Sequence, residues 1–196
     1  AYDGDIDTLE QGGEPRKVDV TVLADRKHNP VAYDRDSSGA AQMAVSPDGD
    51  EVAFIRRGEV YVTSAEYNTT RQITDTPEQE RSVSFSPDGR SLLYASERNG
   101  SWNLYQTSLV RKDEKGFANA TLLKETPILE NDRETFQPAY SPDGKEVAFL
   151  EERTTLKVLN LESKEERVIL PAKYNYSYAD GDQHYQWSPD GNWFVE

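Results

Sequence analysis

The sequence repeats one tetrapeptide, Ser-Pro-Asp-Gly, four times, and this repeat constrains the fold more than any other feature. The copies begin at positions 46, 86, 141 and 188, a spacing of roughly 40–55 residues that indicates a repeat architecture. An apolar or aromatic residue precedes each copy, and an apolar run follows it. The repeated residues are Ser46, Pro47, Asp48, Gly49, Ser86, Pro87, Asp88, Gly89, Ser141, Pro142, Asp143, Gly144, Ser188, Pro189, Asp190 and Gly191.

The tetrapeptide has the chemistry of a tight turn. Proline presets φ at the second position, aspartate tolerates the third, and glycine accepts the exit geometry. The serine hydroxyl can accept a hydrogen bond from the backbone of the turn. Each copy is therefore predicted to join a short strand to a strongly apolar strand, and a run such as Val-Ala-Phe suits a strand buried on both faces.

Further short strands are predicted in each repeat, and Asn99-Gly100 adds a hairpin signal. No segment longer than a turn or two has helical periodicity. Four strands per repeat predict an all-β fold, a β-propeller forming a partial ring of four-stranded antiparallel blades, about three complete and two partial. The additional strands are expected at residues 59–63, 71–74, 102–106, 120–123, 156–159 and 167–170.

The repeat also predicts the organisation of the chain. Residues 1–20 are interpreted as the second half of a preceding blade, residues 21–41 as a connector, and residues 42–196 as blades of which the last is truncated. The charged stretch 110–119 is expected to be a loop at the rim. A chain that begins and ends within a blade is expected to be a piece of a longer protein, and its open blade edges predict self-association.

Composition excludes several classes of function. The chain carries 22 Lys and Arg against 36 Asp and Glu, a net charge of −14, which disfavours nucleic acid and anionic lipid as partners. There is no cysteine for disulfides or thiolate chemistry, and no apolar run long enough to span a membrane. The first residues do not form a signal peptide, so either the protein is cytoplasmic or the given sequence starts inside its precursor; the repeat analysis favours the second.

The sequence predicts no catalytic residue, no cofactor and no metal ion. The repeated Ser and Asp residues are explained as turns, and the two histidines, His28 and His184, do not lie beside a nucleophile motif. Alternating acidic residues at Asp3, Asp5 and Asp7, and the pair Asp180 and Asp182, are interpreted as solvated loops, because the completing features of a calcium loop are missing.

Aromatic residues are densest near the end of the sequence. Trp187 and Trp193 flank the fourth turn and are predicted to lie in the core. Three tyrosines, Tyr174, Tyr176 and Tyr178, are candidate ligand-facing residues, with an inter-blade connection as the alternative.

The repeat resembles the WD-like repeat of TolB-type propellers, on three motifs: the apolar residue before Ser-Pro-Asp-Gly with Val-Ala-Phe after it, Gly-Glu-Val-Tyr-Val at 58–62, and Arg-Gln-Ile-Thr at 71–74. Within that group, residues 46–63 and Gly-Gly-Glu-Pro-Arg-Lys-Val at 12–18 are most similar to tricorn-type serine proteases. That resemblance implies an exported, non-catalytic propeller segment that binds or channels peptides toward a catalytic domain outside this chain. No catalytic residue of the family matches a position here.

Two alternatives remain open. The first is a TolB-like periplasmic propeller that binds a protein partner. The second is the propeller of a prolyl-oligopeptidase-type enzyme or of a sugar lyase. The resemblance favours a periplasmic or otherwise exported protein, with the cytoplasm as the other possibility, and a peptide or protein as the ligand.

Overall fold

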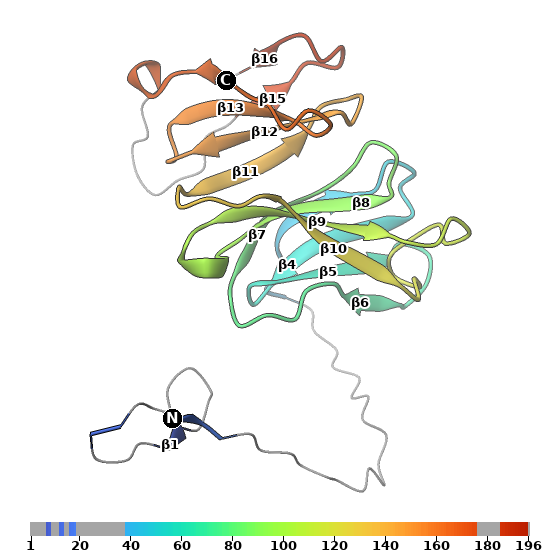
Figure 1. Ribbon diagram of the computed structural model, residues 1–196. Coiled ribbons are helices and arrows are strands. Elements are labelled where there is room, and N and C mark those ends of the chain that lie inside the picture. The colour runs from blue at the N-terminus through green and yellow to red at the C-terminus, as the bar shows by residue number, and fades with distance from the viewer. Residues whose placement is uncertain (1–6, 9–11, 14–15, 19–37, 176–184, 196) are drawn as a thin grey trace, which may run out of the picture. The chain divides into compact units, whose positions relative to one another are not determined.

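The computed structural model describes residues 7–8, 12–13, 16–18, 38–175 and 185–195. The chain divides into two compact units, residues 1–37 and residues 38–196, each described by itself. In the first unit, β1 (Asp7–Thr8) pairs antiparallel with β2 (Arg16–Lys17) (Figure 1). This hairpin lies within the segment interpreted as half of a preceding blade, an assignment that stays a prediction.

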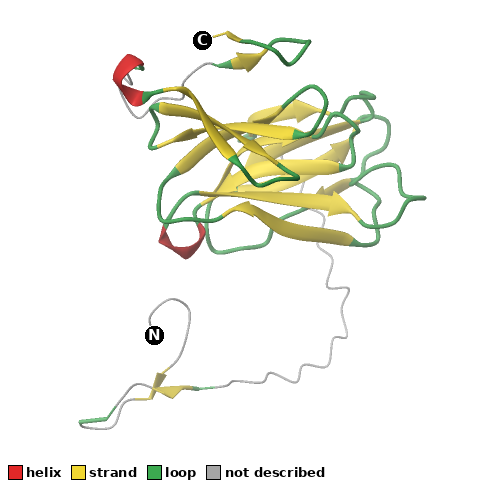
Figure 2. Ribbon diagram, turned by 45° about the horizontal axis from the view of Figure 1, so that its top comes forward, coloured by secondary structure: helices red, strands yellow, loops and turns green. Residues whose placement is uncertain are grey.

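The second unit is built from successive four-stranded antiparallel sheets, in which the strands pair in chain order (Figures 1 and 2). The first sheet contains β3 (Ala41–Val45), β4 (Glu51–Arg56), β5 (Glu59–Ser64) and β6 (Thr70–Gln72). The second contains β7 (Glu80–Phe85), β8 (Ser91–Ser96), β9 (Asn103–Leu109) and β10 (Leu123–Leu129). The third contains β11 (Thr135–Tyr140), β12 (Glu146–Glu151), β13 (Thr155–Asn160) and β14 (Glu166–Leu170).

A final hairpin of β15 (Gln186–Trp187) and β16 (Phe194–Val195) follows the third sheet. The helical elements of the described residues are two three-residue turns, η1 (Arg98–Gly100) and η2 (Ala172–Tyr174). The predicted all-β fold with four-stranded antiparallel blades is confirmed. We call the three complete sheets blades 1, 2 and 3.

The second strand of a blade is its most buried element. In β8 every residue after Ser91 is buried, and in β12 every residue after Glu146 is buried. Successive side chains of a strand point to opposite faces, so these two strands are covered on both sides, as the apolar runs predict. In β4 the burial alternates, and every second residue is half-buried.

Two apolar cores lie at the junctions between blades. Val60 and Val62 of blade 1 meet Leu92 and Tyr94 of blade 2 in the first core. The second core joins blade 2 to blade 3 and includes Leu93 from the same strand. Because β8 alternates its side chains between the two cores, blade 2 links them into one continuous packing arrangement.

At the edge of the second core, two arginines cover two aromatic rings. The guanidinium of Arg81 lies 5.2 Å from the ring centre of Trp102, and that of Arg153 lies 4.5 Å from the ring centre of Phe136. The two rings are themselves 5.6 Å apart. Cation–π contacts of this kind stabilise a junction without requiring a carboxylate partner.

The first strand of each blade contains a bulge at the same repeat position. Gln42, Ser82 and Gln137, each four residues before the serine of the next turn, have φ values of 52°, 59° and 49°. The strand register shifts at each of these places. Non-glycine residues rarely adopt positive φ, so the recurrence indicates a constraint built into the repeat.

Two predictions in blade 2 were wrong. The fourth strand was placed at residues 120–123, whereas β10 spans Leu123–Leu129. None of the residues of this strand is buried, and Pro127 lies beside a register shift, so the segment does not show the apolar pattern of a strand. The charged stretch 110–119 is not wholly a rim loop either, because Phe117 is completely buried in the first core.

Candidate protein-interaction site

The four Ser-Pro-Asp-Gly segments form one turn structure with a closed set of hydrogen bonds. In each, the serine Oγ donates to Oδ1 of the aspartate, at 2.6, 2.5, 2.7 and 2.5 Å in chain order. The same Oγ accepts the backbone N–H five residues later, and Oδ1 accepts the N–H two residues after the aspartate. The glycine N–H donates to the serine carbonyl at 2.9 Å, with glycine φ between 70° and 81°. All four copies therefore share one turn conformation.

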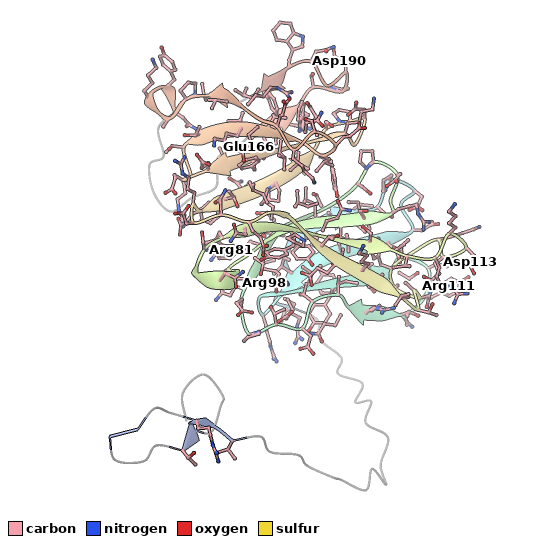
Figure 3. All side chains as sticks on the ribbon, viewed as in Figure 1. Arg81, Arg98, Arg111, Asp113, Glu166 and Asp190 are labelled. Carbon is pink, nitrogen blue, oxygen red and sulfur yellow. The ribbon has the colours of Figure 1, made fainter. Side chains whose placement is uncertain are left out.

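These hydrogen bonds keep the turn aspartates ionised. The serine hydroxyl is the main cause of the lowered pKa of Asp48 and Asp143. The pKa of Asp190 is lowered to about 2, first by the hydroxyl of Ser188 and then by the side chain and backbone N–H of Asn192. At Asp88, partial burial favours the neutral acid, but the hydrogen bonds from Ser86 and the backbone outweigh it and its pKa is also lowered. The turns therefore present fixed negative charges, and Figure 3 labels one of these aspartates, Asp190.

Consecutive turns contact each other. A Cβ placed on Gly89 would lie 3.6 Å from the ring of Pro47, and one on Gly144 would lie 3.5 Å from Pro87. The same contact, at 3.6 Å, joins Gly191 to Pro142. The proline of one turn thus packs on the glycine of the next, and the four turns form a column at one end of the blades.

A groove of about 470 Å³ opens beside this column, between blades 2 and 3. Asp88 and Asp143 line it, together with Pro87 and Ser91. We call it the turn groove. Its wall is a hydrogen-bonded polar surface: the hydroxyl of Tyr140 donates to Oε1 of Gln106 at 2.8 Å, and Nε2 of Gln106 donates to Ser108 at 2.8 Å. Sequence reasoning missed this groove, because two separate repeats supply its residues.

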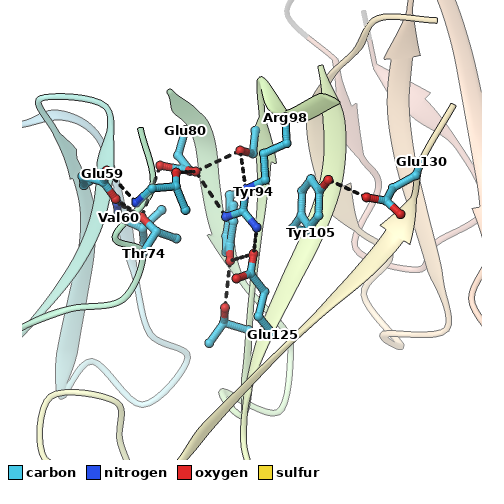
Figure 4. A network of polar contacts seen from close by, with 12 residues as sticks. Glu59, Val60, Thr74, Glu80, Tyr94, Arg98, Tyr105, Glu125 and Glu130 are labelled. Atoms are coloured by element: carbon cyan, nitrogen blue, oxygen red, sulfur yellow. Dashed lines mark hydrogen bonds and ion pairs between the residues drawn. The ribbon is translucent and has the colours of Figure 1, made fainter. Parts of the chain in front are cut away.

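A second polar cluster lies at the opposite end of the strands, at the junction of blades 1 and 2 (Figure 4). Glu80 is buried, and its Oε1 accepts hydrogen bonds from Ser96 at 2.9 Å and from Thr76 at 3.0 Å. The Thr74 hydroxyl lies 2.6 Å from Glu59 Oε2 and 3.2 Å from Glu80 Oε2, so two carboxylates share one hydroxyl. Burial raises the pKa of Glu80 above its usual range.

Arg98 connects this carboxylate to the rest of blade 2. Its guanidinium lies 3.4 Å from Glu80 and 2.5 Å from Glu125, and it stacks 4.4 Å from the ring centre of Tyr105. Tyr105 in turn donates to Glu130 at 2.6 Å. Every charged group in this cluster has a partner, so we interpret it as part of the structural junction. Arg98 and Arg81 lie at the end of blade 2 opposite Arg111 and Asp113 (Figure 3).

The structure describes only some of the predicted aromatic residues. Tyr176 and Tyr178 lie outside the described residues, whereas Tyr174 is 70% exposed, with the Lys173 ammonium 4.6 Å from its ring centre. Trp187 is buried and donates to the carbonyl of Ala139, as predicted for a core residue. The prediction for Trp193 was wrong: its side chain is 72% exposed. Glu51, at the same repeat position, is covered by residues 117–118 of the next blade, whereas in the described residues β15 and β16 form a sheet of two strands alone.

The other candidate residues give no site among the residues that the structure describes. His28, His184, Asp3, Asp5, Asp180 and Asp182 lie outside them. Within the described ranges, no group of three or more His, Cys, Asp or Glu side chains could hold a metal ion. The two helical turns described above are also too short to span a bilayer, and no longer helix occurs in the described chain.

Comparison with known proteins gives a consistent class. No protein-family profile matches the chain. It is 38% identical over 52 residues to the Tol-Pal system protein TolB of Bordetella pertussis and to that of Bordetella bronchiseptica. The match covers 26% of this chain and 12% of each relative, so the chain corresponds to a small part of their length.

Two solved structures share the fold. TolB from Acinetobacter baumannii superimposes with a TM-score of 0.57 at 18% identity, over 78% of this chain and 36% of that one. A protein described as TolB from Agrobacterium tumefaciens gives a TM-score of 0.53 at 16% identity, over 80% and 52%. The described sheets are therefore blades of a β-propeller. The local sequence similarity and these structures show that the propeller is similar to TolB; similarity to tricorn-type proteases is not shown by these relatives.

Proposed function

We propose that this chain is a non-catalytic binding propeller of the TolB kind, which binds a protein partner as part of a Tol-Pal system. The observation that carries the proposal is the 38% identity over 52 residues to proteins named for that system. The shared blade architecture supports it, because blade edges and grooves offer surfaces for protein ligands. The partner could be recognised as a folded protein or through a peptide segment.

The chemistry of the repeated turns supports a binding role over a catalytic one. Each turn serine donates to its own aspartate and accepts a backbone N–H, so its hydroxyl is committed on both sides. A nucleophilic serine instead needs a general base that takes its proton. The absence of catalytic activity stays part of the proposal.

The proposed compartment is the periplasm, or another exported location, in keeping with the resemblance to TolB-type propellers. A cysteine-free chain is compatible with an oxidising compartment, since it has no thiol to mispair. The cytoplasm remains the alternative. Detection of the native protein after selective release of the periplasmic contents would test this part of the proposal.

The binding role can be tested with purified proteins. The chain, immobilised on a biosensor, is presented with each soluble component of the Tol-Pal system from the same organism. We expect saturable binding to one component, reduced by competition with free chain. Chain unfolded in urea and presented under the same conditions is the control. If none of the components binds the folded chain, the proposal fails.

The prediction of a tricorn-like peptidase segment that channels peptides stays a prediction without support from the comparisons. It differs in expecting a peptidase domain encoded downstream, which the full reading frame would reveal. Both readings expect the chain itself to leave an unstructured protein such as β-casein intact. Cleavage of β-casein by homogeneous chain, followed by mass spectrometry, would contradict both.

A further inference from the structure

The chain itself occupies one of the two grooves between the three complete blades that the structure describes. Between blades 1 and 2, beside the turn column, the segment after β9 turns inward and buries Phe117, whose ring lies 6.0 Å from that of Phe85. Glu51 of blade 1 accepts the backbone N–H groups of Phe117 and Ala118 at 2.9 and 2.7 Å. A short backbone turn, closed by a hydrogen bond from the Ala120 N–H to the Phe117 carbonyl, is thus held by a side chain of the neighbouring blade.

Other contacts show how closely this segment fits. Arg90 donates to the carbonyl of Arg111 at 2.8 Å and to that of Glu114 at 3.0 Å. A Cβ on Gly116 would lie 2.6 Å from Oε1 of Glu51, which leaves no space for a side chain there. The groove between blades 1 and 2 is therefore occupied by a segment of the chain itself, residues 116–118.

The turn groove is the equivalent place between blades 2 and 3, and the chain leaves it open. The repeat aligns Ser91 with Glu51, Tyr140 with Phe85, and Lys145 with Arg90. In blade 2 residues 110–122 separate the third strand from the fourth, whereas in blade 3 residues 161–165 are enough. The third blade has no segment of its own to fill the groove, and a volume of about 470 Å³ remains.

The open groove differs from the filled one in polarity. At the position of Val62 it has Gln106, and at the position of Phe85 it has Tyr140, so an apolar side chain such as that of Phe117 would meet a polar wall. The carboxylates of Asp88 and Asp143 add two negative charges. The nearby Lys145 ammonium is 3.7 Å from Asp143, but it is 77% exposed and its charge is screened by solvent.

We propose that the turn groove binds a short segment of a partner protein and takes a lysine or arginine side chain between Asp88 and Asp143. The occupied groove between blades 1 and 2 shows the manner of binding, in which a backbone segment enters beside the turn column. Two carboxylates and hydrogen-bonding groups select a long cationic side chain in place of an aromatic one. This inference rests on the proposed binding function and specifies a surface and a ligand for it.

The test uses the ¹⁵N-labelled chain and three acetylated, amidated pentapeptides, Gly-Gly-Arg-Ala-Gly and its counterparts with Phe or Glu in place of Arg. We expect the arginine peptide to shift the NMR signals of the Gln106 side-chain amide and of Ser91. The Phe and Glu peptides should produce much smaller shifts. Raising the salt concentration from about 50 mM to about 500 mM should weaken binding, because the contact is partly exposed.

Matched variants locate the site. Asp88→Asn and Asp143→Asn should each weaken binding of the arginine peptide by about threefold. The amide oxygen of the asparagine can still accept the turn hydrogen bonds. Asp48→Asn makes the same change in a turn outside the open groove and should leave binding unchanged. Equal effects of all three variants, or equal binding of the three peptides, would overturn the proposal.

The same variants separate this inference from the proposed function. The Tol-Pal component that binds the chain is measured against Asp88→Asn and Asp143→Asn on the biosensor. Weaker binding of both peptide and component supports the inference. If the component binds these variants as it binds the unaltered chain, the turn groove is not the docking site and the inference fails, while the binding function stands.

Discussion

At the scale of single residues, the turn serines are the most heavily used side chains of the repeat. One hydroxyl closes the turn by donating to the aspartate, and it also fixes the start of the next strand by accepting a backbone N–H. Ser46, Ser86 and Ser141 are buried, so their hydrogen bonds are protected from water. The aspartate depends on this donor for its lowered pKa.

Ser86→Ala is expected to lower the free energy of unfolding by about 1–3 kcal/mol, because the half-buried Ser91 N–H loses its acceptor and the Asp88 carboxylate loses one of its hydrogen-bond donors. Urea unfolding followed by tryptophan fluorescence measures the change. Ser163→Ala is the control, since that exposed serine accepts a single long hydrogen bond of 3.3 Å, and its loss should change stability by less than about 0.5 kcal/mol. Equal losses in the two variants would contradict the role assigned to the turn.

Glu80 is expected to make stability depend on pH. Its pKa is raised by burial, so its contribution to stability is fully present below the ordinary value of 4.5 and is lost as the pH rises through the higher folded pKa. Glu80→Gln should remove this decline, seen in urea unfolding at a series of pH values. Glu162→Gln, at an exposed position, is the control for removing a charge. A decline of unchanged size in Glu80→Gln would assign it to another group.

At the scale of elements, the insertion after β9 turns a loop into part of the core. Its clasp consists of Glu51 from one blade and the backbone around Gly116 from the next. A strand residue and a loop far apart in sequence therefore stabilise each other. The clasp also fixes blade 1 against blade 2 at the turn end, while the Glu80 cluster does so at the other.

Gly116→Ala is expected to destabilise the chain by about 1–3 kcal/mol, because the added methyl group displaces the Glu51 carboxylate. A double-mutant cycle with Glu51→Ser tests the cause. In the Glu51→Ser background the same glycine substitution should cost much less, since the carboxylate it collides with is gone. Additive losses in the cycle would show that the clasp is not responsible.

At the scale of the whole molecule, blade 2 joins the two cores through adjacent residues of one strand. Leu92 faces the first core and Leu93 the second, and both are fully buried. Loss of packing on either side removes support from the same strand. The described blades should therefore behave as one cooperative unit.

Leu92→Ala and Leu93→Ala are each expected to cost about 2–5 kcal/mol of stability. Both variants should still unfold in a single calorimetric transition at a lower temperature, as expected for cores that share β8. Ile169→Ala, at an exposed position of β14, is the control and should change little. Two separate transitions in Leu92→Ala would show that the junctions unfold independently.

The repeated tetrapeptide was enough to predict the blades, because turn chemistry and the apolar run after it are local properties of the sequence. The bounds of strand β10 were not predicted correctly, because its partly exposed residues and Pro127 resemble a loop. The burial of Phe117 was not predicted, because one aromatic residue in a charged stretch gives no periodic signal. The turn groove could not be predicted, since Gln106 and Tyr140 read as ordinary strand residues until the neighbouring blade places them side by side.

The insertion of blade 2, residues 110–122, which fills the groove between blades 1 and 2, has an evolutionary consequence. A longer connection between the third and fourth strands of a blade fills the groove beside it. A shorter connection leaves that groove open, and the sheets themselves do not change. A propeller built from similar blades can therefore gain or lose a binding groove at each junction independently. The number of residues between the third and fourth strands of a blade, which can be counted in any relative, therefore indicates which inter-blade grooves are open.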